Sequence, residues 1–381
     1  MSLPDRVAAA LSARPAPVCA YVYDPAAAAV RAAEVRAALP AGTTLLYAVK
    51  ANGHPALVQA LARACDGLEV ASGGELQLAA GAGARSIVFG GPGKTDAELA
   101  LALRAGAQIN VESAHELRRL DALAGAAGVV ADVCLRINRS AAGPPGSHAM
   151  TGTPTAFGID ETQLGAVLAL DTPHVRVIGF HLHAVSNNLD GSAHARFLTD
   201  SLDWSVTTAA EYGLPLRVVN AGGGLGVDYR SGASMDLTAL RGVRVPAGVT
   251  LIVEPGRFLA ADAGWYATTV LDLKRTHGRW FAVVRGGTHH FRLPAAWGYS
   301  HPFTVLPVPG WPYPWERPSV SGTEVDVAGE LCTPRDVLAR GERVGRLRVG
   351  DVLVFARTGA YGWDISHHDF LRHPPPEFVV L

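Results

Sequence analysis

Residues 44–52 read Thr-Leu-Leu-Tyr-Ala-Val-Lys-Ala-Asn, and the interpretation of the whole chain starts from this stretch. Five of the seven residues from Thr44 to Lys50 are apolar, which predicts a buried strand that ends at the lysine. A lysine in that position is costly unless it is neutral or covalently engaged. A desolvated amine attacks carbonyl and aldehyde groups, so Lys50 is a candidate anchor for a cofactor. The alternative is a lysine that extends from the strand end into solvent.

Strands and helices alternate around this stretch. We expect strands at 44–50, 67–71, 86–90, 107–111, 131–138, 176–183, 215–220 and 250–254. Helical spacing separates most of them, which predicts an α/β fold with a (β/α)8 barrel over residues 25–265. Beyond 265, short alternating runs broken by Gly and Pro predict an antiparallel β-barrel or sandwich domain over 266–381. Residues 1–24 are assigned to that domain, although the strand at 18–23 could belong to either part.

The composition narrows the possible classes of function. The chain has 381 residues, a formal net charge of -1 and no basic stripe, so we expect neither nucleic-acid nor membrane binding. Its four cysteines are scattered without metal-ligand spacing, which argues against a metal site or a disulfide framework. No signal segment opens the sequence, and no run of about 18 apolar residues occurs. We therefore expect a cytoplasmic protein.

Polar residues gather where the predicted strands end, which is where barrel enzymes build their active sites. These residues are Lys50, Glu69, Arg136, Asn138, His181, His183, Ser186, Asn220 and Glu254. Strand seven also runs into Ala221-Gly222-Gly223-Gly224-Leu225-Gly226, whose backbone amides could converge on a phosphate. A surface turn is the alternative for such a run. A phosphate site, a nucleophilic lysine and a carboxylate together indicate pyridoxal 5'-phosphate (PLP).

The motifs resemble those of the fold-type III PLP enzymes, which include diaminopimelate, ornithine and arginine decarboxylases and alanine racemase. The resemblance covers nearly the whole chain. It rests on YAVKAN at 47–52, GLEVAS at 67–72, LRIN at 135–138, HAVS at 183–186, the glycine run, EPGR at 254–257, GELC at 329–332 with Asp336, and GAYG at 359–362. It implies an alanine-racemase-like TIM barrel with a C-terminal β domain, a homodimer and a PLP cofactor.

The resemblance also implies roles for individual residues. Lys50 would hold the cofactor aldehyde covalently, and His183 would stack on the pyridine ring. The residues expected to contact the phosphate are Ser186, Gly223, Gly224, Gly256, Arg257 and Tyr361. Glu69 and Arg136 match positions near the cofactor. For single residues the alternatives are ordinary ones: a core histidine, an aromatic packed on a turn, or a surface salt bridge.

Glu254 and Cys332 carry the predicted chemistry. A carboxylate beside the pyridine nitrogen keeps that nitrogen protonated, so the ring accepts the electron pair left when carbon dioxide departs. Alanine racemases have an arginine there, so Glu254 favours decarboxylation over racemisation. Cys332 matches the family's cysteine that returns a proton to the substrate carbon, supplied across a dimer interface. The sequence thus predicts an amino-acid decarboxylase.

The residue after the cysteine departs from the family pattern. Diaminopimelate decarboxylases have a glutamate there and ornithine decarboxylases an aspartate, whereas this chain has Thr333, followed by Arg335. A hydroxyl and an arginine suit a carboxylate or amide better than an ammonium group. We therefore expect a substrate with an acylated or conjugated distal end, as in siderophore assembly on a citryl-diaminopropionate unit or in butirosin formation. The candidate substrate-binding residues are Thr333, Arg335, Asp336, His289 and Arg292.

Three alternatives remain open at this point. The first is a decarboxylase of free diamino acids, above all of diaminopimelate, against which Thr333 argues. The second is a racemase, which Glu254 disfavours. The third is a PLP-binding regulator without catalytic activity, although Lys50, Glu254 and Cys332 are all present.

Overall fold

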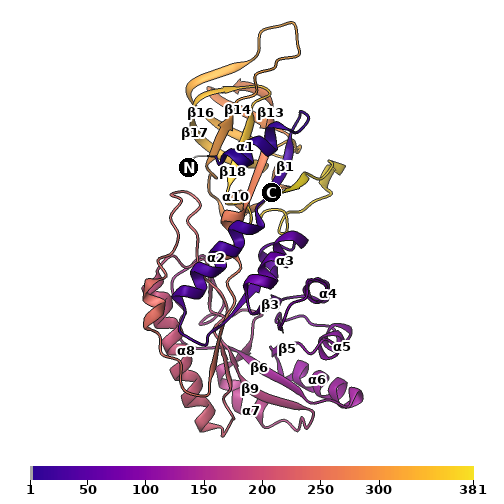
Figure 1. The fold of residues 1–381 in the computed structure, drawn as a ribbon, viewed down its shortest axis with the longest axis vertical. Coiled ribbons are helices and arrows are strands. Elements are labelled where there is room, and N and C mark those ends of the chain that lie inside the picture. The colour runs from indigo at the N-terminus through magenta and orange to yellow at the C-terminus, as the bar shows by residue number, and fades with distance from the viewer. Residues whose placement is uncertain (1–2) are drawn as a thin grey trace. The chain divides into compact units, whose positions relative to one another are not determined.

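The computed structural model describes residues 3–381, which form two compact units (Figure 1). The barrel unit comprises Ala29–Val227 and Ser234–Leu259. The β unit comprises residues 3–28, Asp228–Ala233 and Ala260–Leu381.

Eight parallel strands close the barrel, as the sequence predicts. They are β2 (Thr44–Ala48), β3 (Gly67–Val70), β4 (Ile87–Phe89), β5 (Gln108–Val111), β6 (Ala131–Asn138), β9 (Val175–His181), β11 (Val218–Asn220) and β12 (Thr250–Val253). Neighbours along the order β5-β4-β3-β2-β12-β11-β9-β6 are hydrogen-bonded, and β5 also pairs with β6. Closure brings the carboxyl ends of all eight strands to one rim.

Helices connect most of these strands. They are α2 (Pro25–Ala38), α3 (Pro55–Ala64), α4 (Gly73–Gly81), α5 (Asp96–Arg104), α6 (Ala114–Ala127), α7 (Leu164–Leu168), α8 (Gly191–Glu211) and α9 (Arg257–Ala260). Between β11 and β12 there is only a 3-10 turn, Thr238–Gly242. Side-chain caps fix several starts, as at Ser72, Thr95 and Ser113. None of the helices within residues 3–381 is long and apolar enough to cross a membrane.

Strand β2 ends earlier than predicted. It stops at Ala48, and Lys50 lies in a 3-10 turn over Val49–Ala51 that the amide of Asn52 closes on the carbonyl of Val49. Gly256 packs closely against this turn: a Cβ there would lie 3.0 Å from the carbonyl of Ala48. The turn carries Lys50 out of the strand.

Apolar side chains from several strands fill the barrel. One buried cluster comprises Leu46, Val88, Cys134, Ile178, Val218 and Ile252, which come from six different strands. This layer is a packed core, so in the barrel unit an active site is expected at the rim.

The β unit contains the predicted second domain. Its strands are β1 (Cys19–Tyr23), β13 (Gly264–Thr276), β14 (Arg279–Val284), β15 (Phe303–Leu306), β16 (Ser319–Ala328), β17 (Val337–Arg348), β18 (Val352–Ala356) and β19 (Glu377–Val380). Most pairings are antiparallel, as expected, but β1 with β19 and β14 with β16 are parallel. Strand β1 pairs with β13 and β19, so it is part of this sheet.

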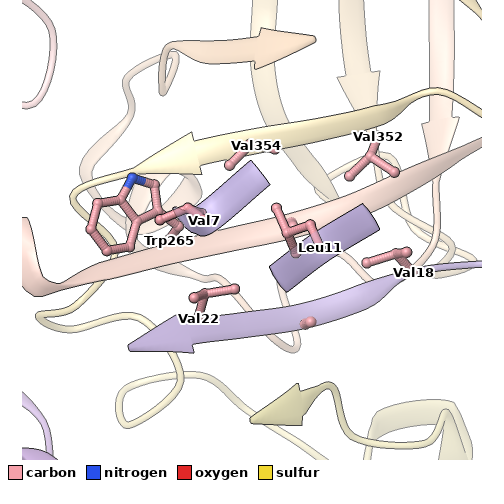
Figure 2. Close-up of a cluster of buried hydrophobic side chains, with 9 residues drawn as sticks. Val7, Leu11, Val18, Val22, Trp265, Val352 and Val354 are labelled. Carbon is pink, nitrogen blue, oxygen red and sulfur yellow. The ribbon is translucent and has the colours of Figure 1, made fainter. Parts of the chain in front are cut away.

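Helix α1 (Asp5–Ser12) completes the core of the β unit (Figure 2). Its buried residues Val7 and Leu11 are four positions apart and therefore lie on one face. They pack in a cluster of buried residues with Val18, Val22, Trp265, Val352 and Val354. The amino-terminal segment thus folds with strands that come more than 200 residues later.

Replacing Leu11 should test this packing. Leu11 is 1% exposed, so Leu11→Ala should lower the free energy of unfolding by about 2–5 kcal/mol through lost burial and a residual cavity. Leu271→Ala is the matched control, because Leu271 lies on β13 in the same unit and is 41% exposed. Equilibrium denaturation in urea should separate the two variants, and equal losses would contradict the assignment of α1 to this core.

Candidate active site

Lys50 and Glu69 form an ion pair at the barrel rim. The Lys50 Nζ lies 2.7 Å from Oε2 of Glu69, which is the third residue of β3. The Glu69 side chain is buried, whereas the Lys50 side chain is 43% exposed. The expected desolvated lysine is therefore not what the structure contains, because the turn after β2 lifts the amine to the mouth of the barrel.

Glu254 is a buried carboxylate at the end of β12. Asn220, the last residue of β11, donates its amide Nδ2 to Oε1 of Glu254 over 2.5 Å. The Oε2 atom faces Nε2 of His181 at 3.6 Å. Burial raises the pKa of Glu254, and the negative charge of Glu69 adds to the effect. Burial and the charge of Arg136 lower the pKa of His181, so this ring stays neutral at neutral pH.

The glycine run begins directly after Asn220. The Asn220 Oδ1 accepts the amide of Gly222, and the Gly223 amide donates to Nδ1 of His183 over 3.0 Å. Because Nδ1 accepts, the proton of the neutral His183 ring lies on Nε2. Burial and the charge of Arg136 lower the pKa of His183 as well.

Several of these glycines have no room for a side chain. A Cβ would lie 2.3 Å from Nδ1 of His183 at Gly222, 2.5 Å from the Glu254 carbonyl at Gly223, and 2.9 Å from the Val185 carbonyl at Gly224. Gly222 and Gly224 also have positive φ angles of 69° and 103°. The run is therefore a tightly packed loop at the rim rather than a surface turn.

The remaining barrel residues that the sequence singled out also lie at strand ends. Gly256 follows β12 and packs against the turn that holds Lys50. Arg257 is buried and begins α9. Ser186 belongs to a short strand, β10 (Val185–Ser186), which pairs with β7 (His148–Ala149) in the loop after β6. This pairing gives the long 139–156 loop an ordered place beside Ser186.

Arg136 is part of a buried network that the sequence interpretation missed. Its guanidinium lies 2.9 Å from Oε1 of Glu112, and both side chains are buried. Glu112 also accepts the amides of Gly91 and Gly158. Lys94 is buried beside it and pairs with Glu116 at 2.6 Å. Glu112 follows β5 directly, so the strand-end rule could have found it.

In the β unit, Cys332 is exposed on the loop between β16 and β17. Asp336 holds this loop: its Oδ1 accepts the amide of Thr288 and its Oδ2 the amide of Leu331. This carboxylate is buried. Tyr361 has a φ of 54°, an uncommon backbone conformation for an aromatic residue.

A cavity of about 780 Å³ lies next to the cysteine loop within the β unit. Thr333, Arg335 and Arg292, all predicted to bind substrate, line it. Its walls also include Thr288, Pro294, Ala295, Ala296, Gly298, Tyr299, Ser300, Val337, Ala339, Arg340 and His367. His289 is not in this wall: it is buried 3.7 Å from Glu330, beside His290 and His373.

Comparisons with known proteins agree with this arrangement. Residues 27–261 match the family described as pyridoxal-dependent decarboxylase, pyridoxal binding domain. The chain is 40% identical over 388 residues to 2-[(L-alanin-3-ylcarbamoyl)methyl]-2-hydroxybutanedioate decarboxylase of Staphylococcus aureus, covering 97% of this chain and 96% of that protein. It is 32% identical to L-glutamyl-[BtrI acyl-carrier protein] decarboxylase of Niallia circulans, with 93% and 87% covered.

A solved structure extends the comparison to the fold. The crystal structure of diaminopimelate decarboxylase from Helicobacter pylori, complexed with L-lysine, superposes with a TM-score of 0.83 at 26% identity. The match covers 96% of this chain and 91% of that one. The barrel and its rim thus define a PLP-dependent carboxy-lyase. The chain belongs to the pyridoxal-dependent decarboxylase family, and both the predicted enzyme class and the predicted cofactor are confirmed.

The rim has the groups that PLP requires. The packed glycine loop has no room for side chains at 222–224, and since the amides of Gly222 and Gly223 already donate to Asn220 and His183, the amide of Gly224 is the one left for a phosphate. Glu254 is a buried acid that accepts from Asn220 and faces His181, and among residues 3–381 neither nitrogen of His181 has a hydrogen-bond partner. Lys50 reaches the same rim from β2. These residues fit the cofactor.

A substitution in the glycine loop should weaken the cofactor site. Gly222→Ala would drive a methyl group into the His183 ring, so we expect the Kd for PLP to rise at least about tenfold, which corresponds to about 1.4 kcal/mol. Gly213→Ala is the matched control, because Gly213 has a similar φ of 64° and open space around it. Absorbance titration with PLP measures both variants. Unchanged affinity in Gly222→Ala would contradict the role of the loop.

Proposed function

We propose that the enzyme decarboxylates an L-amino acid whose distal end is acylated and rich in carboxylates. The name of the staphylococcal relative describes such a compound, in which a citrate-derived unit is joined by an amide to the side chain of an alanine. A substrate of this citryl-diaminopropionate type, as used in siderophore biosynthesis, is the one we assign to this chain.

The chemistry at the substrate's α-carbon depends on the cofactor's ring. PLP, when bound, accepts the electron pair left when carbon dioxide departs. Glu254 is the residue we assign to hold a proton against the ring nitrogen. Asn220 occupies Oε1, so Oε2 would be the atom that holds this proton. Its raised pKa suits this role, because a buried carboxyl shares a proton more readily than one stabilised as an anion.

The other barrel residues bind and orient. Lys50 would carry the cofactor and release it to the incoming amine, and Glu69 would fix the amine's position. His183, neutral and anchored through Nδ1, would present its ring face for stacking. Ser186, Gly223, Gly224, Gly256 and Arg257 would bind the phosphate, and Arg136 would contribute positive charge near it.

One observation carries the choice of substrate: no Asp or Glu lines the cavity beside Cys332. A free diamino acid presents an ammonium group at its distal end, which needs an acidic partner. Thr333 and Arg335 offer a hydroxyl and a guanidinium instead. Asp336 cannot serve as that acid, because backbone amides engage both of its oxygens. This chemistry argues against diaminopimelate decarboxylation, the alternative function.

A substrate panel tests the proposal. Carbon dioxide release should be measured from the citrate amide of 2,3-diaminopropionate and from free diaminopimelate, lysine and ornithine. We expect kcat/KM to be at least about 10²-fold higher for the amide, because the free ammonium groups would lie unpaired among arginines. Rapid release from a free diamino acid, with none from the amide, would refute the substrate assignment.

We further propose that the enzyme is a homodimer in which Cys332 and Tyr361 act in the partner's site. Cys332 would then give its thiol proton to the substrate carbon beside the partner's Lys50. The support is indirect: Cys332 is exposed on its own chain, and the resemblance to the family implies shared sites.

Mixing two inactive variants tests this arrangement. Lys50→Ala and Cys332→Ala should each lose nearly all activity. Co-expressed, they should recover about a quarter of the wild-type rate, because half of randomly formed dimers are mixed and each mixed dimer has one intact site. Co-purification with two different affinity tags identifies the mixed dimers. Mixed dimers without activity would argue that each chain contains its whole site.

A further inference from the structure

Three arginines from three separate segments line the cavity beside the cysteine loop. Arg292 precedes α10 (Leu293–Trp297), Arg335 lies on the cysteine loop, and Arg340 is the fourth residue of β17. Within residues 3–381, no hydrogen bond or ion pair engages any of the three guanidinium groups. By contrast, Arg279, Arg285 and Arg348 of the same unit each pair with a carboxylate.

Side-chain hydroxyl groups hold the backbone at two of the three arginines. The Arg340 amide donates to Oγ of Ser300 over 2.8 Å, and that hydroxyl donates to the Arg340 carbonyl over 3.0 Å. The Arg292 amide donates to Oγ of Ser366 over 3.0 Å. Three like charges are thus held around one space, an arrangement whose repulsion an anion would relieve.

The size and chemistry of the cavity identify the anion. Its volume of about 780 Å³ lies in the range of small-molecule sites, roughly 300–1,000 Å³. Guanidinium groups bind carboxylates through paired hydrogen bonds, and several of them around one cavity suit a ligand with several carboxylates.

We propose that this cavity is a polycarboxylate site in which Arg340, which neither the sequence analysis nor the comparisons single out, binds the distal carboxylates together with Arg335 and Arg292. The inference rests on the proposed function and deepens it. It also has a consequence for regulation: a free tricarboxylate binds the same cavity and competes with the substrate.

Free citrate is the probe for this site. Isothermal titration of the PLP-loaded enzyme should detect citrate binding, and Arg340→Ala should weaken it about 10- to 100-fold, the size expected for one charged hydrogen-bonded pair. Arg340→Lys keeps the positive charge but loses the planar guanidinium group, so its affinity for citrate should fall between those of the wild type and Arg340→Ala. Acetate, with a single carboxylate, should bind far more weakly than citrate.

Arg346→Ala is the matched control. Arg346 is exposed on the same strand but does not line the cavity. This variant should bind citrate as the wild type does. In steady-state assays citrate should raise the apparent KM for the amide substrate, and Arg340→Ala should raise KM more than it lowers kcat.

The outcomes separate the two proposals. If the wild type releases no carbon dioxide from the citrate amide, the proposed function is wrong whatever Arg340 does. If the wild type does so, and Arg340→Ala keeps both its KM and its citrate affinity, the site assignment is wrong and the function stands. If Arg346→Ala and Arg340→Ala weakened citrate binding equally, the effect would come from general surface charge, and the site assignment would be wrong.

Discussion

The hydrogen bond from Asn220 to Glu254 is the constraint on which the barrel rim depends. It joins the ends of two neighbouring strands, β11 and β12, and fixes the buried carboxylate of Glu254 at the rim. The same Asn220 side chain accepts the amide of Gly222, and the Glu254 amide donates to the Gly222 carbonyl. The amide side chain of Asn220 thereby fixes the position of the Glu254 carboxylate and the start of the glycine loop. Gly223 in that loop in turn positions the ring of His183.

The charges of the rim follow a clear division. Lys50, Arg136 and Lys94 each lie beside a carboxylate, from Glu69, Glu112 and Glu116 respectively. Glu254 instead has an amide and a neutral imidazole for neighbours. A buried carboxylate that is not salt-bridged gains more from pairing with a protonated ring nitrogen than one that already has a cationic partner. Because Lys50, Arg136 and Lys94 already have acidic partners, Glu254 is the acid that remains to pair with a protonated ring nitrogen.

The sequence was sufficient to predict the barrel strands, but not the contacts between residues on different strands. Alternating apolar and helical patterns located all eight barrel strands, and the strand-end rule drew attention to Lys50 and Glu254. The predicted strand overran β2 by two residues, since the turn at Lys50 packs against Gly256, more than 200 residues away, and the local pattern does not show that contact. Asn220 stood at a strand end, but its role depends on the pairing of β11 with β12. Glu112 was missed although it follows a strand, because its role depends on the buried ion pair that it forms with Arg136.

The same limit explains why Arg340 could not be found from the sequence. An arginine in an alternating strand normally faces solvent, and nothing in the local pattern distinguishes Arg340 from Arg346. What distinguishes them is the cavity, which gathers Arg292, Arg335 and Arg340 from segments up to 48 positions apart. The rim of the barrel neutralises its bases with acids of its own, whereas this cavity leaves three bases without one. A site that binds the carboxylates of a ligand through arginines cannot also contain carboxylates that pair with those arginines. The fourteen residues that line this cavity include no Asp or Glu.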